Sequence, residues 1–229
     1  MWFYHPQNTD PWIEGKRGLW QFFYEVVPWL SALLGFASLA ILALGIVRRG
    51  KKRYQLYGLF LFLSVLLGPG LVVNVVFKDN WERPRPREVQ VFGGEQIYVP
   101  PLVFGSSGNS FPCGHCSIAF VFSAFYLLWR RRHPVWAWGM LSGSTVLGLS
   151  IGMSRMAAGG HFLSDVLWSA VLTWMVLLVL YWLVMKIPWR EDDSEQYLVS
   201  RDTDATKLVK LALVGAATAG MLYFVWLLY

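Results

Sequence analysis

Six apolar runs constrain the fold of this chain more than any other feature of its sequence. Crossing the hydrocarbon layer of a bilayer takes about 20 mostly apolar residues in a helix. Runs that reach or approach this length cover residues 26–47, 54–77, 117–129, 135–153, 162–185 and 208–229. Only helices satisfy their own backbone hydrogen bonds in lipid when the connections are this short. We therefore predict an all-α, polytopic transmembrane helix bundle with about six spanning helices.

The composition agrees with a membrane protein. The chain is 55% hydrophobic and only 15% charged, whereas a soluble domain carries about 25% charged residues. The net charge of +6 does not indicate nucleic-acid binding, because the basic residues cluster at the ends of apolar runs. The predicted partners are a lipid bilayer and a membrane lipid, and the sequence leaves the oligomeric state open.

Basic connections predict the orientation in the membrane. The connections at 48–53 and 130–133 are rich in Lys and Arg, which favours the cytoplasmic side. Alternation then places the loop 78–111, the turn 154–161 and both termini on the opposite face. This outer loop is itself basic, so its cations need a local reason to lie there, and an anionic ligand would supply one.

Three polar clusters interrupt the apolar sequence, at residues 78–86, 112–115 and 154–165. The predicted topology brings all three to the outer face. An ionised group at the centre of a membrane helix costs about 2.5–3.5 kcal/mol on insertion scales. So many ionisable groups at helix ends are therefore expected to converge on one wet cavity at the interface.

The cations of these clusters suit a phosphate group. Lys78, Arg85 and Arg155 supply positive charge, and guanidinium groups add bidentate hydrogen bonds. Gly114 allows close backbone approach, and its N–H is expected at the start of a helix, where anions are favoured.

Two histidines and one aspartate suit nucleophilic catalysis. His161 and Asp165 are four residues apart, so they share one face of a helix. A carboxylate bonded to one imidazole nitrogen would leave the other free to attack phosphorus. His115 can then protonate the leaving alkoxide and later activate water. We predict no metal and no other cofactor, because two-metal phosphatases need several carboxylates and Asp165 is the one obvious candidate.

The complete pattern resembles the type 2 phosphatidic acid phosphatase family over about residues 56–184. The family pattern is Lys, six residues, Arg-Pro; then Pro-Ser-Gly-His; then Ser-Arg, five residues, His, three residues, Asp. The resemblance implies a phosphohistidine intermediate on His161, orientation by Asp165, and acid/base catalysis by His115. It also implies a set of phosphate-binding residues: Lys78, Arg85, Cys113, Gly114, Ser154 and Arg155.

The chain departs from the family pattern in three respects. The serine of the second motif is Cys113 here, and a thiol is a weaker hydrogen-bond donor. Arg83-Pro84 offers a second register for the first motif; we favour Arg85 and assign Arg83 and Arg87 to lipid headgroups as an alternative. Family members commonly place three spans before the first motif, whereas this chain has two there and an extra one at the C-terminus.

The two cysteines raise a rival interpretation. Cys113 and Cys116 form a Cys-Gly-His-Cys sequence, which is typical of disulfide isomerases, but that function requires a thioredoxin-like βαβ context. We expect free thiols, with a regulatory disulfide as the alternative. A non-catalytic scaffold or a transporter is disfavoured by the complete motif spacing, and Gly68-Pro69-Gly70 is interpreted as a helix kink.

An amphiphilic substrate is expected, because a soluble phosphate would not need a site at the lipid interface. Local similarity at 91–94, 100–101 and 109–112 resembles the branch acting on lipid A phosphates of Gram-negative envelopes. This resemblance implies a hydrolase of the bacterial inner membrane with a periplasmic site, acting on lipid A, with the 1-phosphate as the suggested target. Undecaprenyl pyrophosphate, phosphatidylglycerol phosphate and phosphatidic acid are alternatives.

The predicted organisation has two parts. Residues 1–25 are expected to form an interfacial amphipathic segment, and residues 26–229 the transmembrane phosphatase domain. Within that domain, 78–111 is the outer loop with the first motif, 186–207 a cytoplasmic connection, and 208–229 the extra C-terminal span.

Overall fold

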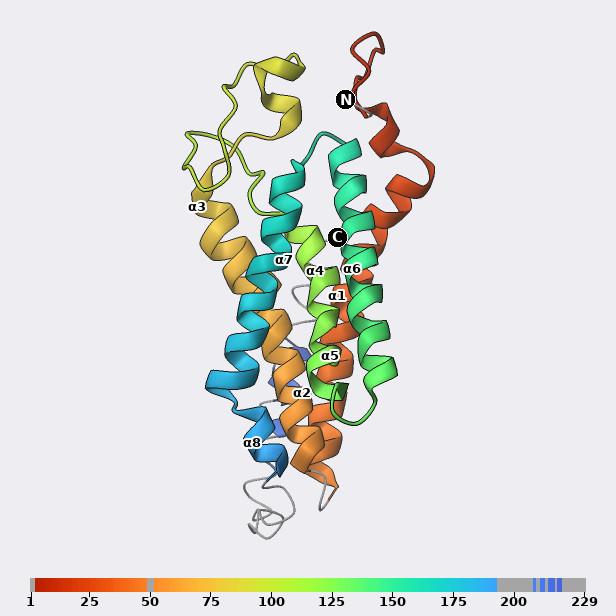
Figure 1. Ribbon diagram of the computed structural model, residues 1–229, viewed down its shortest axis with the longest axis vertical. Coiled ribbons are helices and arrows are strands. Elements are labelled where there is room, and N and C mark those ends of the chain that lie inside the picture. The colour runs from red at the N-terminus through yellow and green to blue at the C-terminus, as the bar shows by residue number, and fades with distance from the viewer. Residues whose placement is uncertain are drawn as a thin grey trace. The chain divides into compact units, whose positions relative to one another are not determined.

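The computed structural model describes residues 3–48 and 52–192, with scattered positions between 208 and 219 (Figure 1). In this part of the chain every regular element is helical, and the only β pairing is an isolated bridge between Val89 and Gln96. The predicted all-α class is confirmed. The connection 186–207 beyond residue 192 and the C-terminal span 208–229, apart from those scattered positions, lie outside the described residues.

Three helices in the described residues are long and apolar enough to cross a membrane. They are α1 (Gly18–Val47), the helix from Lys52 to Glu88, which includes α2 (Lys52–Val65), and the helix from Leu163 to Val184, which includes α7 (Leu163–Leu178). The apolar stretch Gly114–Trp129 is also helical but shorter. These helices coincide with four of the predicted runs, while the total of six spans stays a prediction.

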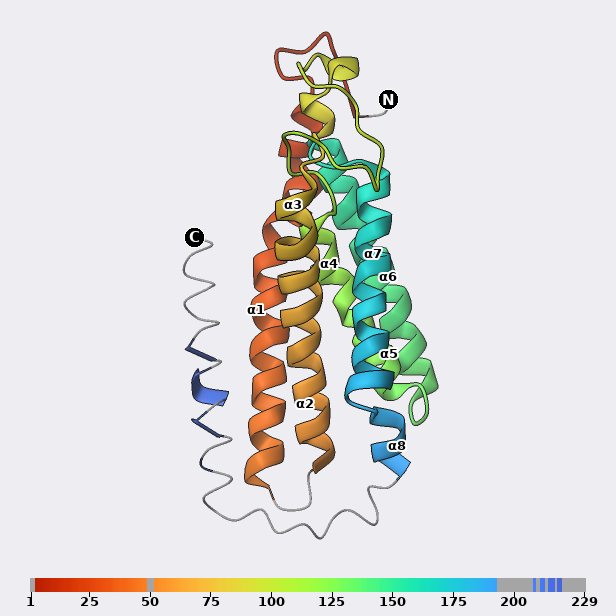
Figure 2. The same ribbon diagram turned by 90° about the vertical axis from the view of Figure 1, so that its left-hand side faces the viewer.

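The chain divides into two compact units, and the first comprises Met1–Val27 and Leu67–Met175. Its framework is α6 (Pro134–Ala157), against which α4 (Gly114–Phe120), η5 (Val121–Ser123) and α5 (Ala124–Trp129) pack. The contact is close because Gly148 on α6 lies against the Phe120 ring, where a Cβ would collide. After α6 the chain turns at residues 158–162 and enters α7 (Figure 2).

One long helical segment of the first unit is π-helical. Residues Leu66–Lys78 form the π-helix η2, which contains the Gly68-Pro69-Gly70 sequence. Proline lacks an N–H and disturbs the regular ladder. One turn later, the Asn74 side-chain amide donates to the Pro69 carbonyl at 2.7 Å. The predicted irregularity is therefore present as a π-helical segment rather than as a simple kink.

Short elements follow η2 at the loop end of the first unit. These are α3 (Asp79–Trp81), η3 (Pro86–Glu88) and η4 (Gln90–Phe92). The N-terminal segment contacts this region, because Tyr4 and Trp12 lie 5.2 Å and 5.6 Å from the Phe92 ring. The segment contains η1 (Ile13–Lys16), and α1 then runs without interruption through the boundary that the sequence placed at residue 25.

The second unit comprises Pro28–Leu66 and Val176–Tyr229. Here α1 and α2 approach closely at two glycines: a Cβ at Gly45 would collide with the backbone of Gln55, and one at Gly58 with that of Leu42. The helices η6 (Val179–Val184) and α8 (Ile187–Asp192) join the same unit. The Tyr57 hydroxyl donates to Glu191 of α8.

We predict that Gly58→Ala destabilises the protein. Its Cβ has no space against the backbone of α1, and such overpacking typically costs about 1–3 kcal/mol. Gly139→Ala is the matched control, since nothing lies within 4 Å of that Cβ on α6. Thermal unfolding in detergent should separate the two variants, and equal midpoints would contradict the close packing of α1 and α2.

Candidate active site

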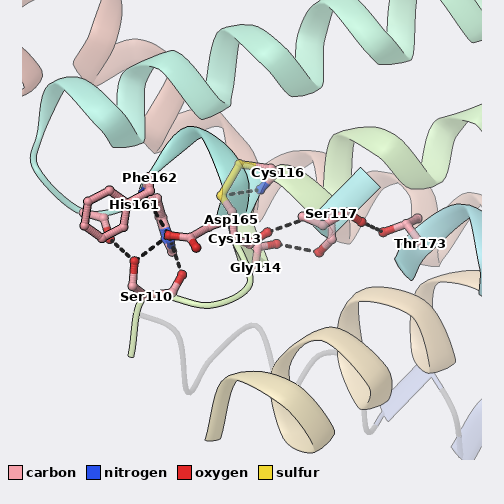
Figure 3. The surroundings of a disulfide bond; sticks show 11 residues. Ser110, Cys113, Gly114, Cys116, Ser117, His161, Phe162, Asp165 and Thr173 are labelled. Atoms are coloured by element: carbon pink, nitrogen blue, oxygen red, sulfur yellow. Dashed lines mark hydrogen bonds and ion pairs between the residues drawn. A yellow bond between two sulfur atoms is a disulfide. The ribbon is translucent and has the colours of Figure 1, made fainter. Parts of the chain in front are cut away.

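The second and third motifs meet where α4 begins beside α7 (Figure 3). The Cys113 N–H donates to the Asp165 carbonyl at 3.1 Å, and the Ser169 hydroxyl donates to the Cys113 carbonyl at 2.8 Å. These bonds attach the start of α4 to the first turns of α7. The predicted convergence of the two motifs is therefore present in the structure.

His161 has a defined tautomer. Its Nδ1 lies 2.5 Å from the backbone carbonyl oxygen of Ser110 (Figure 3). Because a carbonyl oxygen can only accept, Nδ1 must carry the hydrogen and Nε2 must hold the free lone pair. The side chain is buried, and this burial lowers the pKa of His161 below its ordinary value, although Asp165 opposes the shift. The lowered pKa favours the neutral imidazole, in which Nδ1 carries the hydrogen.

Asp165 does not hold His161 in the way predicted. Its Oδ2 lies 3.7 Å from His161 Nδ1, beyond hydrogen-bond distance. The carboxylate instead accepts from the Ser110 hydroxyl at 2.6 Å and from the Phe162 N–H at 2.8 Å, and it pairs with Arg83. The predicted direct bond is thus replaced by an indirect arrangement, in which Asp165 fixes Ser110 and the Ser110 carbonyl fixes His161.

Arg83 is the buried partner of Asp165. Both side chains are completely covered. The guanidinium group also donates to the Ser164 hydroxyl at 2.9 Å and to the Val99 carbonyl at 2.8 Å, and it lies 4.4 Å from the Phe162 ring centroid. The alternative assignment of Arg83 to a lipid headgroup is therefore wrong, because its donors are engaged inside the protein.

Four further ionisable groups remain partly exposed: Lys78, Arg85, His115 and Arg155. The charges of Lys78, Arg85 and Arg155 all lie within electrostatic range of His115. Within the described part of the chain, the Nε atoms of Arg85 and Arg155 are buried and have no hydrogen-bond partner. Buried donors without partners are rare, so these two suit a bound anion. This favours Arg85 over Arg83 as the arginine of the first motif.

Two predicted phosphate contacts are placed differently. The sulfur of Cys113 is bonded to Cys116 in a disulfide, so the expectation of free thiols is wrong and a thiol donor is absent there. Their Cα atoms are 5.4 Å apart, within the range that a bridge allows. The buried Ser154 hydroxyl donates to the Trp20 carbonyl of α1 at 2.5 Å, which engages it in holding α1.

Gly114 begins α4, as predicted, and Cys113 is its N-cap residue. A Cβ at this position would collide with the Asn74 side chain of η2. The requirement for glycine here therefore includes packing against η2.

The sequence did not identify three contributors to the site. For the Arg83–Asp165 pair, the only sign in the sequence was that Arg83-Pro84 also fits the Arg-Pro element of the first motif. Ser110 acts through its backbone carbonyl, for which residue type gives no signal. Tyr24 of α1 stacks on His115 with ring centroids 5.0 Å apart, and it lies far outside the motifs.

No group of three or more His, Cys, Asp or Glu side chains arranged to hold a metal occurs in the described residues. The carboxylate nearest to His161, that of Asp165, is already engaged by Arg83, Ser110 and Phe162. The side chains available to a ligand around His115 are thus cationic, which suits an anion.

Comparison with known proteins identifies similar chains. A family model described as the PAP2 superfamily matches residues 56–189. The chain is 35% identical over 176 residues to a lipid A 4'-phosphatase of Francisella tularensis subsp. novicida (strain U112), covering 73% of this chain and 77% of that protein.

More distant similarity extends to two further proteins. A lipid A 4'-phosphatase of Rhizobium leguminosarum is 31% identical, covering 52% of this chain and 49% of that protein. A lipid A 1-phosphatase of Porphyromonas gingivalis is 30% identical, covering 44% of this chain and 22% of that protein. No solved structure matches.

We predict that Arg83→Met is strongly destabilising. It leaves the Asp165 carboxylate buried without its cation, and breaking a buried ion pair from one side typically costs about 3–5 kcal/mol. Arg87→Met is the control, because Arg87 directly follows the same motif but is exposed. Chemical denaturation in detergent should reveal the difference. If the two variants unfold alike, the buried ion pair does not stabilise the site.

Proposed function

Because the chain belongs to the PAP2 superfamily, we propose that it removes a phosphate monoester from lipid A through a phosphohistidine on His161. Its apolar helices and its relatives make it a membrane lipid phosphatase. One observation carries the proposed mechanism: the Ser110 carbonyl holds Nδ1 of His161 and leaves Nε2 free.

In the first step, Nε2 of His161 donates its lone pair to phosphorus while the ester P–O bond breaks. The bond electrons leave with the alkoxide oxygen, which takes a proton from the imidazolium form of His115; the negative charge of the bound phosphate favours this form. The imidazole becomes positively charged as it is phosphorylated. The carbonyl of Ser110 and the carboxylate of Asp165, 3.7 Å away, are placed to stabilise that charge.

In the second step, neutral His115 accepts a proton from water as the water oxygen attacks phosphorus. The P–N bond breaks, and its electrons return to Nε2 of His161. Lys78, Arg85 and Arg155 are proposed to hold the phosphoryl oxygens throughout, because guanidinium and ammonium groups stabilise the charge that develops there. Inorganic phosphate and the dephosphorylated lipid are the products.

The 4'-phosphate is the proposed position of attack. The relative with the more extensive match, which extends over 73% of this chain, carries the name lipid A 4'-phosphatase, whereas the similarity to a 1-phosphatase covers 44%. This replaces the 1-phosphate suggested by the sequence as the first position to test. The inner membrane, with the site facing the periplasm, is the proposed location, because the basic connections at 48–53 and 130–133 favour the cytoplasm.

We expect His161→Ala to abolish turnover while the protein still inserts and folds. The variant lacks the attacking nitrogen. Asp165→Asn should keep some activity per folded molecule, since Asp165 acts through Ser110, but it should also lower stability because it leaves Arg83 buried without its counter-ion. His133→Ala is a matched control, because that exposed histidine precedes α6 outside the motifs. The measurement is phosphate release from lipid A, with mass spectrometry of the lipid to distinguish loss of the 1-phosphate from loss of the 4'-phosphate.

The same assay should include undecaprenyl pyrophosphate, phosphatidylglycerol phosphate and phosphatidic acid. A clear preference for one of these over lipid A would contradict the proposed substrate. Substantial activity in His161→Ala would contradict the proposed nucleophile, whatever the substrate.

We expect activity to survive excess EDTA without added Mg²⁺. The phosphate is proposed to be neutralised by Lys78, Arg85 and Arg155, and the carboxylate of Asp165 is already paired with Arg83. Phosphate release with and without chelator is the measurement. Loss of activity that a divalent ion restores would show that protein cations are not sufficient.

A further inference from the structure

We propose that Tyr24 of α1 is a positioning residue of the active site, whose ring holds His115 and Arg155 in place. Tyr24 lies outside residues 56–189, which match the family, and it belongs to none of the three motifs. The inference deepens the proposed function, on which it rests for the roles of His115 and Arg155.

The ring of Tyr24 contacts both groups. It stacks on the His115 imidazole with centroids 5.0 Å apart and an interplanar angle of 27°. The Arg155 guanidinium carbon lies 4.5 Å from the centroid of the same ring. One aromatic side chain thus contacts both the proposed acid/base and one of the proposed phosphate-binding cations.

The position of Tyr24 is itself fixed by contacts with the third motif. The hydroxyl of Ser154, the neighbour of Arg155, donates to the carbonyl of Trp20 at 2.5 Å. Trp20 precedes Tyr24 by four residues, or one helical turn. The bond therefore sets the register of α1 at the point where Tyr24 meets the site, and it gives the buried Ser154 a definite function.

The chain before α1 is held against the same motif. A Cβ at Gly15 would collide with the backbone of Ala158, so the segment lies directly on the end of α6. Gly159 has a φ of +62°, which favours glycine, and a Cβ there would also collide with the ring of Trp12. Contacts made by the segment before α1, together with the Trp20 bond within α1, thus hold Tyr24 against the turn that leads to His161.

The contacts made by Tyr24 have a catalytic consequence. His115 and Arg155 are partly exposed, and Arg155 has a buried Nε without a partner in the described residues. Flexible side chains must be ordered before they can act on a substrate, and misplacement by about 1 Å can cost up to a hundredfold in rate. A flat ring that stacks on both side chains restricts them without using the hydrogen-bonding groups that the substrate needs.

Tyr24 remains 43% exposed, so it is not simply a core residue. A residue with that exposure contributes little to stability when it is changed. Its replacement is therefore expected to affect the site more than the fold, which makes the proposal testable with folded variants.

The test compares Tyr24→Leu, Tyr24→Phe and a control, Phe22→Leu. Phe22 is also exposed and lies two residues earlier on α1. Tyr24→Leu should lower kcat for the lipid substrate by about tenfold or more, with a smaller change in KM, because aromatic stacking and the cation–π contact are both lost. Tyr24→Phe keeps the ring and should retain parental kcat, as should Phe22→Leu.

A binding measurement separates this proposal from the proposed function. Binding of inorganic phosphate, followed by the shift in thermal unfolding, needs no turnover. Tyr24→Leu should weaken it by about threefold or more through Arg155, while Tyr24→Phe and Phe22→Leu should bind like the parent.

Two results would overturn the positioning role. One is Tyr24→Leu behaving like Phe22→Leu in both assays. The other is Tyr24→Phe being as defective as Tyr24→Leu, which would assign the effect to the hydroxyl group. If the parent releases no phosphate from any lipid, the proposed function fails, and the binding assay still decides on Tyr24.

Discussion

The candidate site depends on a completely buried ion pair between Arg83 and Asp165. A buried charge is tolerated only when it is paired and hydrogen-bonded, and here Ser110, Phe162, Ser164 and the Val99 carbonyl complete the network. Ser110 accepts a hydrogen bond from His161 through its carbonyl and donates one to Asp165 through its hydroxyl. The tautomer of the proposed nucleophile, His161, therefore depends on a charge pair that is not hydrogen-bonded to it. The first motif thereby has two functions: one arginine supports the site from within, and another remains available to an anion.

The sequence predicted much of this arrangement, for identifiable physical reasons. Long apolar runs required helices in lipid, and five of them coincide with helices of the structure. Motif spacing predicted that Lys78, Arg85, His115, Arg155 and His161 would lie together, because polar side chains at helix ends must share a wet region. The partner of each side chain was less predictable. Arg83 and Arg85 are the same residue type, so their chemistry does not show which one pairs with Asp165. Only packing determines which of them is buried beside Asp165.

Backbone groups account for the rest of what could not be predicted. The Ser110 carbonyl replaces the expected Asp165 bond to His161, and every residue has such a carbonyl, so composition carries no signal. The sequence likewise did not decide whether Cys113 and Cys116 form the disulfide that the structure contains. Three residues of separation at a helix start allow a bridge but do not require one.

The contacts of the N-terminal segment bear on how sites of this family can differ. Residues 3–24 lie outside the matched region 56–189, yet they pack on Gly159 through Trp12, accept a hydrogen bond from Ser154, and reach His115 through Tyr24. The chemical groups of the motifs are constrained by the reaction, whereas a ring that only packs against them is not. Substitutions in this segment can therefore adjust the placement of the proposed acid/base, His115, and of the proposed phosphate-binding residue, Arg155, while every motif residue stays unchanged.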